Sequence, residues 1–111
     1  MLTAVVLAVV AATAPARVQV AADEFHLVLS RPSIVPGRAL IELVNFGEDE
    51  HDLRLRRLAK PRARTWTLAR VLPGEHAVLE ASLRPGTYQL WCSLADHRAR
   101  GMRATLVVRA T

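Results

Sequence analysis

Short stretches of alternating apolar and polar residues, separated by turn signals, run from residue 18 to the end of the chain. Pro-Gly pairs or other breaks end most of them, and no long stretch has helical periodicity. Side chains that alternate over four to nine residues suit half-buried strands, so we expect seven to eight short strands. The pattern predicts an all-β sandwich or barrel. The expected strands cover residues 18–22, 24–30, 38–46, 51–58, 66–71, 75–83, 87–92 and 102–109, and residues 60–64 are expected to form a basic loop or short helix.

The N-terminal residues differ in composition from the rest of the chain. Residues 2–12 are apolar and rich in alanine, and no charged residue precedes Arg17. Ala14-Pro15-Ala16 has the small-x-small pattern of a signal cleavage site, although no Lys or Arg stands ahead of the apolar run. We expect residues 1–16 to be a signal peptide or an N-terminal anchor, and residues 17–111 to be a single domain. The protein is then exported, to the periplasm or outside the cell, either free or attached to a membrane.

The charge of the chain limits the classes of partner that it can be expected to bind. The net charge is +5, and nearly all the cations are arginines. The run from Arg54 to Arg70 contains seven cations and no acidic residue. Such runs are mostly solvated surface, and the functional alternative is attraction to anionic partners or membrane lipids. No nucleic-acid motif is present, so we expect no nucleic-acid partner.

The chain has one cysteine, Cys92, which excludes an intrachain disulfide. A single thiol in an exported protein pairs with another chain, reacts or is held by a metal. The alternative is a small buried apolar residue. His97 and Met102 follow at intervals of five residues. Thiolate, imidazole and thioether are ligands that together favour copper, and a blue-copper site needs one more histidine.

Three other histidines are candidates for the remaining ligand. His26 is expected on the polar face of a strand, and His76 follows a Pro-Gly turn, so both suit the surface. His51 follows the acidic turn 47–50 and begins a strand, where a rigid element can present a ligand. It stands 41 residues before Cys92. Position alone favours His51 only modestly.

Two segments carry a resemblance to a known family. PGTYQLWCSLADHRARGM, residues 85–102, resembles the ligand loop of the cupredoxins, the blue copper proteins that include plastocyanin, azurin and rusticyanin. Its Cys-x4-His-x4-Met spacing is most similar to that of the rusticyanin-like members. ELVNFGEDEHDLRL, residues 42–55, is similar to the strand that presents the first histidine of the family. Asp52 stands where the family usually has an asparagine that ties the two ligand segments together.

The resemblance implies a Greek-key β-sandwich with one type 1 copper at one end, bound by His51, Cys92, His97 and Met102. It implies a protein that carries single electrons between redox partners, with no small-molecule substrate and no catalysis. We expect a monomer whose redox partner is membrane-bound or acidic. Two alternatives remain open: an exported copper carrier or buffer that uses the same ligands, and a metal-free cupredoxin-like module that binds proteins. Copper enzymes with such domains need more histidines and a longer chain than this one has.

Overall fold

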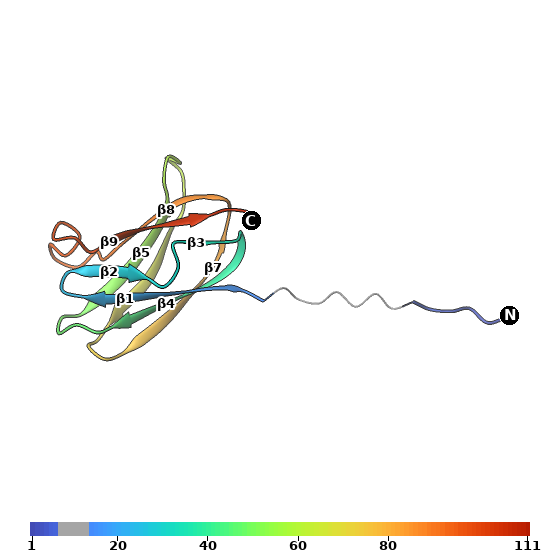
Figure 1. The fold of residues 1–111 in the computed structure, drawn as a ribbon, viewed down its shortest axis with the longest axis horizontal. Coiled ribbons are helices and arrows are strands. Elements are labelled where there is room, and N and C mark those ends of the chain that lie inside the picture. The colour runs from blue at the N-terminus through green and yellow to red at the C-terminus, as the bar shows by residue number, and fades with distance from the viewer. Residues whose placement is uncertain (7–13) are drawn as a thin grey trace.

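The computed structural model describes residues 1–6 and 14–111, and within these residues every regular element is a strand. Figure 1 shows the strands packed side by side, with β1 entering from the N-terminal segment. No helix in the described part of the chain is long and apolar enough to cross a membrane. The strands are β1 (Ala16–Asp23), β2 (His26–Leu29), β3 (Ser33–Ile34), β4 (Gly37–Asn45), β5 (His51–Arg57), β6 (Thr65–Val71), β7 (His76–Leu83), β8 (Gly86–Trp91) and β9 (Arg103–Val108).

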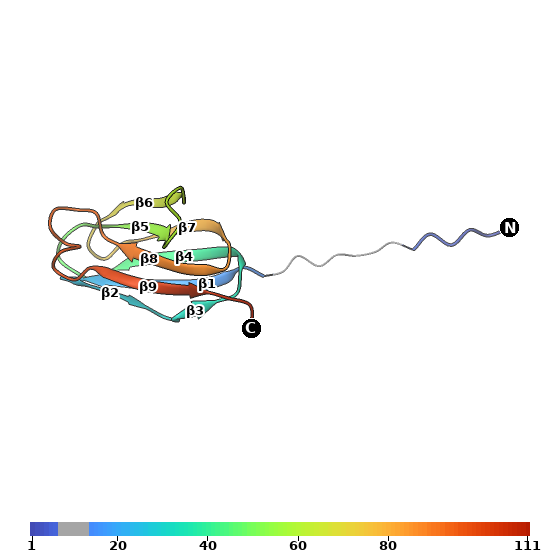
Figure 2. The same cartoon turned by 90° about the horizontal axis from the view of Figure 1, so that it is seen from above.

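The strands form two sheets. One has the order β2-β1-β4-β7 and the other the order β3-β9-β8-β5-β6. Most neighbours are antiparallel, but β1 is parallel to β4 and β3 is parallel to β9. Figure 2 looks onto the faces of the sheets, so that the strands of the two layers overlap in the view. This arrangement is an all-β sandwich, and the predicted fold class is confirmed.

Alternation along the strands builds the core between the sheets. In β4, Ala39, Ile41 and Leu43 are fully buried, while the residues between them are partly exposed. Tyr88 and Leu90 of β8 fill the core from the opposite sheet. The Tyr88 hydroxyl donates to the Arg84 carbonyl at 2.8 Å, so its one polar atom is satisfied. The alternation of apolar and polar residues in the sequence therefore corresponds to burial, because one face of each strand is removed from water.

The structure differs from the sequence-based expectations at a few points. The two-residue strand β3 lies where the prolines suggested a simple break in the chain, because Ser33 and Ile34 pair with the last strand. Of the two alternatives expected for residues 60–64, the structure has the loop, with a turn at residues 61–62. Residues 7–13 of the expected targeting segment, residues 1–16, lie outside the described residues, and its last residue, Ala16, lies in β1.

The core gives a simple stability prediction. We expect Ile41→Val to lower the free energy of unfolding by about 1 kcal/mol, because one buried methylene is lost and its space is only partly refilled. Urea unfolding measures the change, with Val78→Ala as the control, since Val78 is 51% exposed. If both substitutions cost the same, Ile41 does not lie in the main core.

Candidate metal centre

Three potential ligand atoms meet at one end of the sandwich. One atom each from His51, Cys92 and His97 lies within 4.8 Å of the others, and all three residues are buried. The Cys92 Sγ is 3.6 Å from His97 Nδ1, and the His51 and His97 rings are 5.1 Å apart. We name this group the His-Cys-His cluster, and the end of the sandwich that holds it the cluster end.

His51 presents one nitrogen to this cluster and uses the other for support. It is the first residue of β5 and is fully buried. Its Nε2 lies 3.1 Å from a carboxylate oxygen of Glu24, whereas its buried Nδ1 has no hydrogen-bond partner among the described residues. An unpaired buried nitrogen is costly, which makes it a natural ligand atom. A carboxylate behind a histidine is also the usual way in which proteins orient such a ligand.

Glu24 also holds the turn that precedes His51. The same carboxylate oxygen accepts hydrogen bonds from the backbone N–H groups of Glu48 at 2.8 Å and Asp49 at 2.6 Å. The Asp49 N–H is the main reason that the pKa of Glu24 is lowered, with the Glu48 N–H and His51 adding to it. Gly47 leaves room for this carboxylate, since a Cβ there would collide with it. The buried Asn45 fixes the start of the same turn by donating to the Asp49 carbonyl at 2.7 Å.

The remaining candidates lie in one loop after β8. The Cys92 N–H donates to the Met102 carbonyl and the Met102 N–H donates to the His97 carbonyl, each at 3.1 Å. These bonds close the loop on itself and keep Met102 beside the cluster, fully buried. Burial is the main cause that raises the pKa of the Cys92 thiol. A thiol of this kind is a poor free nucleophile, and a bound cation would favour its thiolate.

Comparison with known proteins rests on structure. The sequence matches no protein-family model and no curated protein sequence. Auracyanin B superposes with a TM-score of 0.68 at 22% identity, covering 91% of this chain and 94% of that one. Auracyanin A, a "blue" copper protein from Chloroflexus aurantiacus, gives 0.68 at 13% identity over 86% of this chain and all of that one. A copper nitrite reductase from Nitrosomonas europaea gives 0.61 at 17% identity over 86% of this chain but 42% of that chain.

The chain has a cupredoxin fold. Within this fold, all four predicted ligands lie at the cluster end: His51 at the start of a strand, and Cys92, His97 and Met102 in the loop after β8. The two other histidines are elsewhere on the surface, since His26 and His76 are both exposed. The donor set fits copper, because it joins a thiol, two imidazoles and a buried thioether-bearing residue. The assignment of these residues as ligands stays a prediction.

Asp52 joins the two ligand segments of this cupredoxin fold. It is 4% exposed, and its carboxylate accepts from both the backbone N–H of Ser93, at 2.6 Å, and the Ser93 hydroxyl. Arg54 lies 3.6 Å from the same carboxylate. Aspartate thus makes the link that the resemblance assigns to asparagine, and it adds a negative charge beside Cys92.

His97 lies between an aromatic ring and an acid. The Phe25 ring packs against it with 5.0 Å between centroids, and Asp49 lies 3.7 Å from its Nε2. His97 is 8% exposed, the most accessible member of the cluster. Glu24 and Phe25 were missed by sequence reasoning, because they sit in the β1–β2 turn, far along the chain from the other site residues.

Glu24 gives a prediction for metal affinity. We expect Glu24→Ala to weaken copper binding about tenfold, since the turn and the His51 ring both lose their acceptor. Competition titration against a copper chelator measures the affinity. The matched control is Glu75→Ala, which removes an exposed carboxylate near the same end of the sandwich. Equal affinities in both variants and the parent protein would show that Glu24 does not orient His51.

Proposed function

We propose that this protein is a type 1 copper protein that carries single electrons between redox partners. One observation carries the proposal: three buried donor groups converge within 4.8 Å, and Nδ1 of His51 has no hydrogen-bond partner in residues 1–6 and 14–111. The cupredoxin fold supports it, as does the similarity to auracyanin A, itself a blue copper protein. From the apolar residues 2–12 and the net charge of +5 we further propose that the protein is exported and meets a redox partner that is membrane-bound or acidic.

The chain's own residues would hold the ion and keep water out. His51, Cys92 and His97 would be the strong ligands of the ion, and Met102 would be a fourth, weaker ligand. Bound copper would supply one-electron chemistry by alternating between Cu(I) and Cu(II). Glu24 and Asp52 fix the two ligand segments before any ion arrives, so the ligand positions depend on the fold and not on the metal. Burial of the cluster favours electron transfer over copper delivery, because a carrier must release its ion readily.

Spectroscopy and electrochemistry test the proposal together. The full chain loaded with Cu(II) should show an intense thiolate-to-copper absorption band and narrow copper hyperfine splitting in EPR. It should also be reduced and reoxidised by one electron without losing its metal. A pale spectrum with wide splitting would reject the type 1 site. Rapid release of the reduced ion to a weak chelator would instead indicate a copper carrier.

A further inference from the structure

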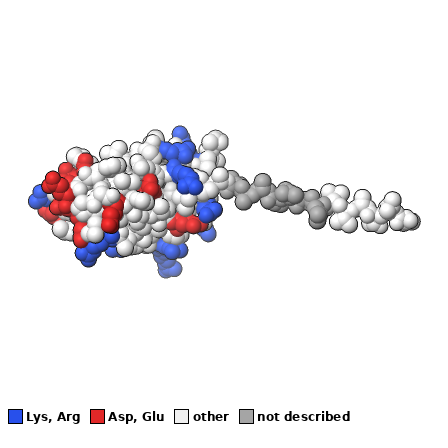
Figure 3. All heavy atoms as spheres, turned by 90° about the horizontal axis from the view of Figure 1, so that it is seen from below, with Lys and Arg blue, Asp and Glu red and all other residues white. Residues whose placement is uncertain are grey.

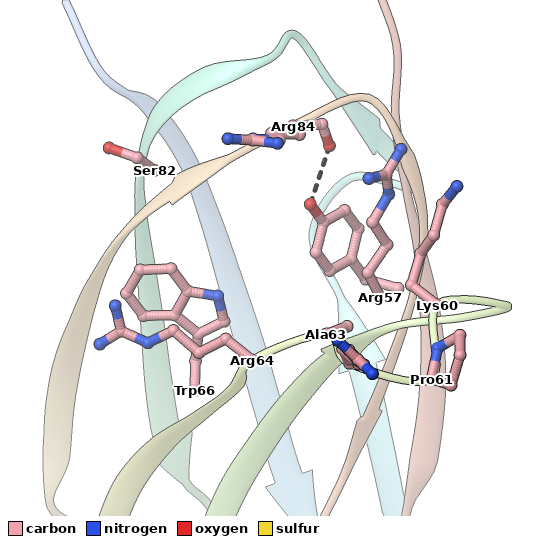
Figure 4. A pocket seen from close by; sticks show the side chains of 10 residues that line it. Arg57, Lys60, Pro61, Ala63, Arg64, Trp66, Ser82 and Arg84 are labelled. Atoms are coloured by element: carbon pink, nitrogen blue, oxygen red, sulfur yellow. Dashed lines mark hydrogen bonds between the residues drawn. The ribbon is translucent and has the colours of Figure 1, made fainter.

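A basic groove lies at the other end of the sandwich. It has a volume of about 600 Å³ and includes the hairpin between β5 and β6 and the turn between β7 and β8. Figure 4 shows Arg57 and Lys60 side by side on one side of it, and Arg64 against the Trp66 ring. The described residues that line it include no acid and five cations, which are Arg57, Lys60, Arg62, Arg64 and Arg84.

The cations of this groove keep their charge available. Among the described residues, the salt bridges involve other arginines, so no carboxylate neutralises a cation of the groove. Arg57 donates to the Pro85 carbonyl, and the Arg64 guanidinium lies 3.6 Å from the centroid of the Trp66 ring. Both contacts leave the positive charge intact, and arginine does not lose its proton in proteins.

The groove shares its end of the sandwich with the start of β1. Ala16 pairs with Ala39, and Ala39 pairs with Ala81, the residue before Ser82 of the groove. We name this the tail end, because the apolar residues 2–12 precede β1 in the sequence. Two exposed apolar side chains, Val35 and Leu58, lie in loops of the same end and are each 45% exposed.

Charge is divided between the two ends. Figure 3 shows most acidic side chains of this face at one end, with a few cations beside them, and mainly Lys and Arg side chains, with some acidic atoms among them, around the end where β1 begins. The strand registers and contacts place most acids at the cluster end: Asp23, Glu24, Glu48, Asp49, Glu50, Asp52, Glu75 and Asp96. A molecule polarised in this way turns its basic end toward a negative surface.

We propose that the tail end docks on the surface of an anionic lipid bilayer, with the His-Cys-His cluster facing away from it. Unpaired cations close to an anionic membrane each add to binding, and the effect is screened by salt. Exposed apolar side chains among cations match the interface between headgroups and acyl chains. The apolar N-terminal residues join the domain at this end, so insertion of that segment and docking of the groove are compatible. Binding of an acidic protein would require only the positive charge of the tail end. A bilayer surface would also contact its exposed apolar side chains, Val35 and Leu58.

Vesicle binding by the full chain tests the proposal. The protein is titrated with vesicles of phosphatidylcholine alone and with vesicles of equal parts phosphatidylcholine and phosphatidylglycerol. We expect tighter partition onto the anionic vesicles, and at least a tenfold loss of that partition when three groove cations are replaced. The variant is Lys60→Gln with Arg62→Gln and Arg84→Gln. The matched control removes the same charge outside the groove, with Arg70→Gln, Arg98→Gln and Arg103→Gln, and should lose much less.

The two tryptophans report orientation even if a triple variant folds poorly. Trp66 lines the groove, and Trp91 ends β8 beside the cluster. In Trp91→Phe, nitroxide-labelled headgroups should quench the remaining Trp66, whereas Trp66→Phe should show little quenching. Equal quenching of both, equal loss in both triple variants, or no preference for phosphatidylglycerol would overturn the proposal. Binding of an acidic protein by the groove without anionic vesicle binding would overturn it too and assign the surface to a protein partner.

Discussion

Replacing Cys92 with serine is expected to abolish the thiolate-to-copper absorption band and to widen the copper hyperfine splitting. The band needs a sulfur donor, and serine offers a hydroxyl that keeps its proton at neutral pH. Cys92 Sγ lies 3.6 Å from His97 Nδ1 in a fully buried position. Because Cys92 is the one cysteine of the sequence, no other thiol can replace it. Absorption and EPR spectra of the copper-loaded variant measure the loss.

The control for Cys92→Ser is His26→Ala, which removes an exposed imidazole on β2. The His26 ring bonds to Asp23 at 2.8 Å and is not a member of the cluster. The control should keep the parent spectrum. A pale spectrum that Cys92→Ser leaves unchanged would mean that the ligand assignment is wrong, and the metal-free binding module would become the leading interpretation.

Asp52→Ala is expected to lower the free energy of unfolding by about 3 kcal/mol. Two donors of Ser93 lose their acceptor. Arg54 also loses its nearby negative charge, and its buried Nε has no hydrogen-bond partner within the described part of the chain. The link between the β5 start and the loop after β8 then opens. Urea unfolding of the metal-free variant measures the change, so the result does not depend on metal binding.

Asp52→Asn separates the hydrogen bond from the charge. An asparagine oxygen still accepts from the Ser93 N–H, so we expect this variant to lose much less stability than Asp52→Ala. It also removes a negative charge beside Cys92, which should raise the reduction potential of a copper-loaded site, since the more positive Cu(II) state loses a stabilising neighbour. Equal destabilisation by alanine and asparagine would show that the charge, and not the bond, holds the two segments.

The fold was largely predictable because burial acts on one face of each strand. Residues 38–46 and 75–83 alternate clearly, and they form β4 and β7. A strand of two residues is too short to show alternation, so β3 could not be predicted from the sequence pattern. It exists because the chain after Pro32 runs beside the last strand: the Val107 N–H donates to the Pro32 carbonyl at 3.0 Å.

The site was only partly predictable. Cys92, His97 and Met102 lie close together in the sequence, so their chemistry is readable as a unit. Choosing His51 over His26 and His76 depended on the resemblance more than on position. Glu24 could not be inferred, because its contact with His51 spans 27 residues and depends on how the β1–β2 turn meets the β4–β5 turn.

The separation of 41 positions between His51 and Cys92 would couple metal content to folding. In the unfolded chain these side chains are ends of a long flexible loop, and bringing them together costs conformational entropy. The folded sandwich has already met that cost, so an ion would bind the native chain far more tightly than the denatured one. The melting temperature would then rise with the free metal concentration. A shortage of metal would leave the site empty and would also shorten the lifetime of the protein, because the metal-free form is less stable.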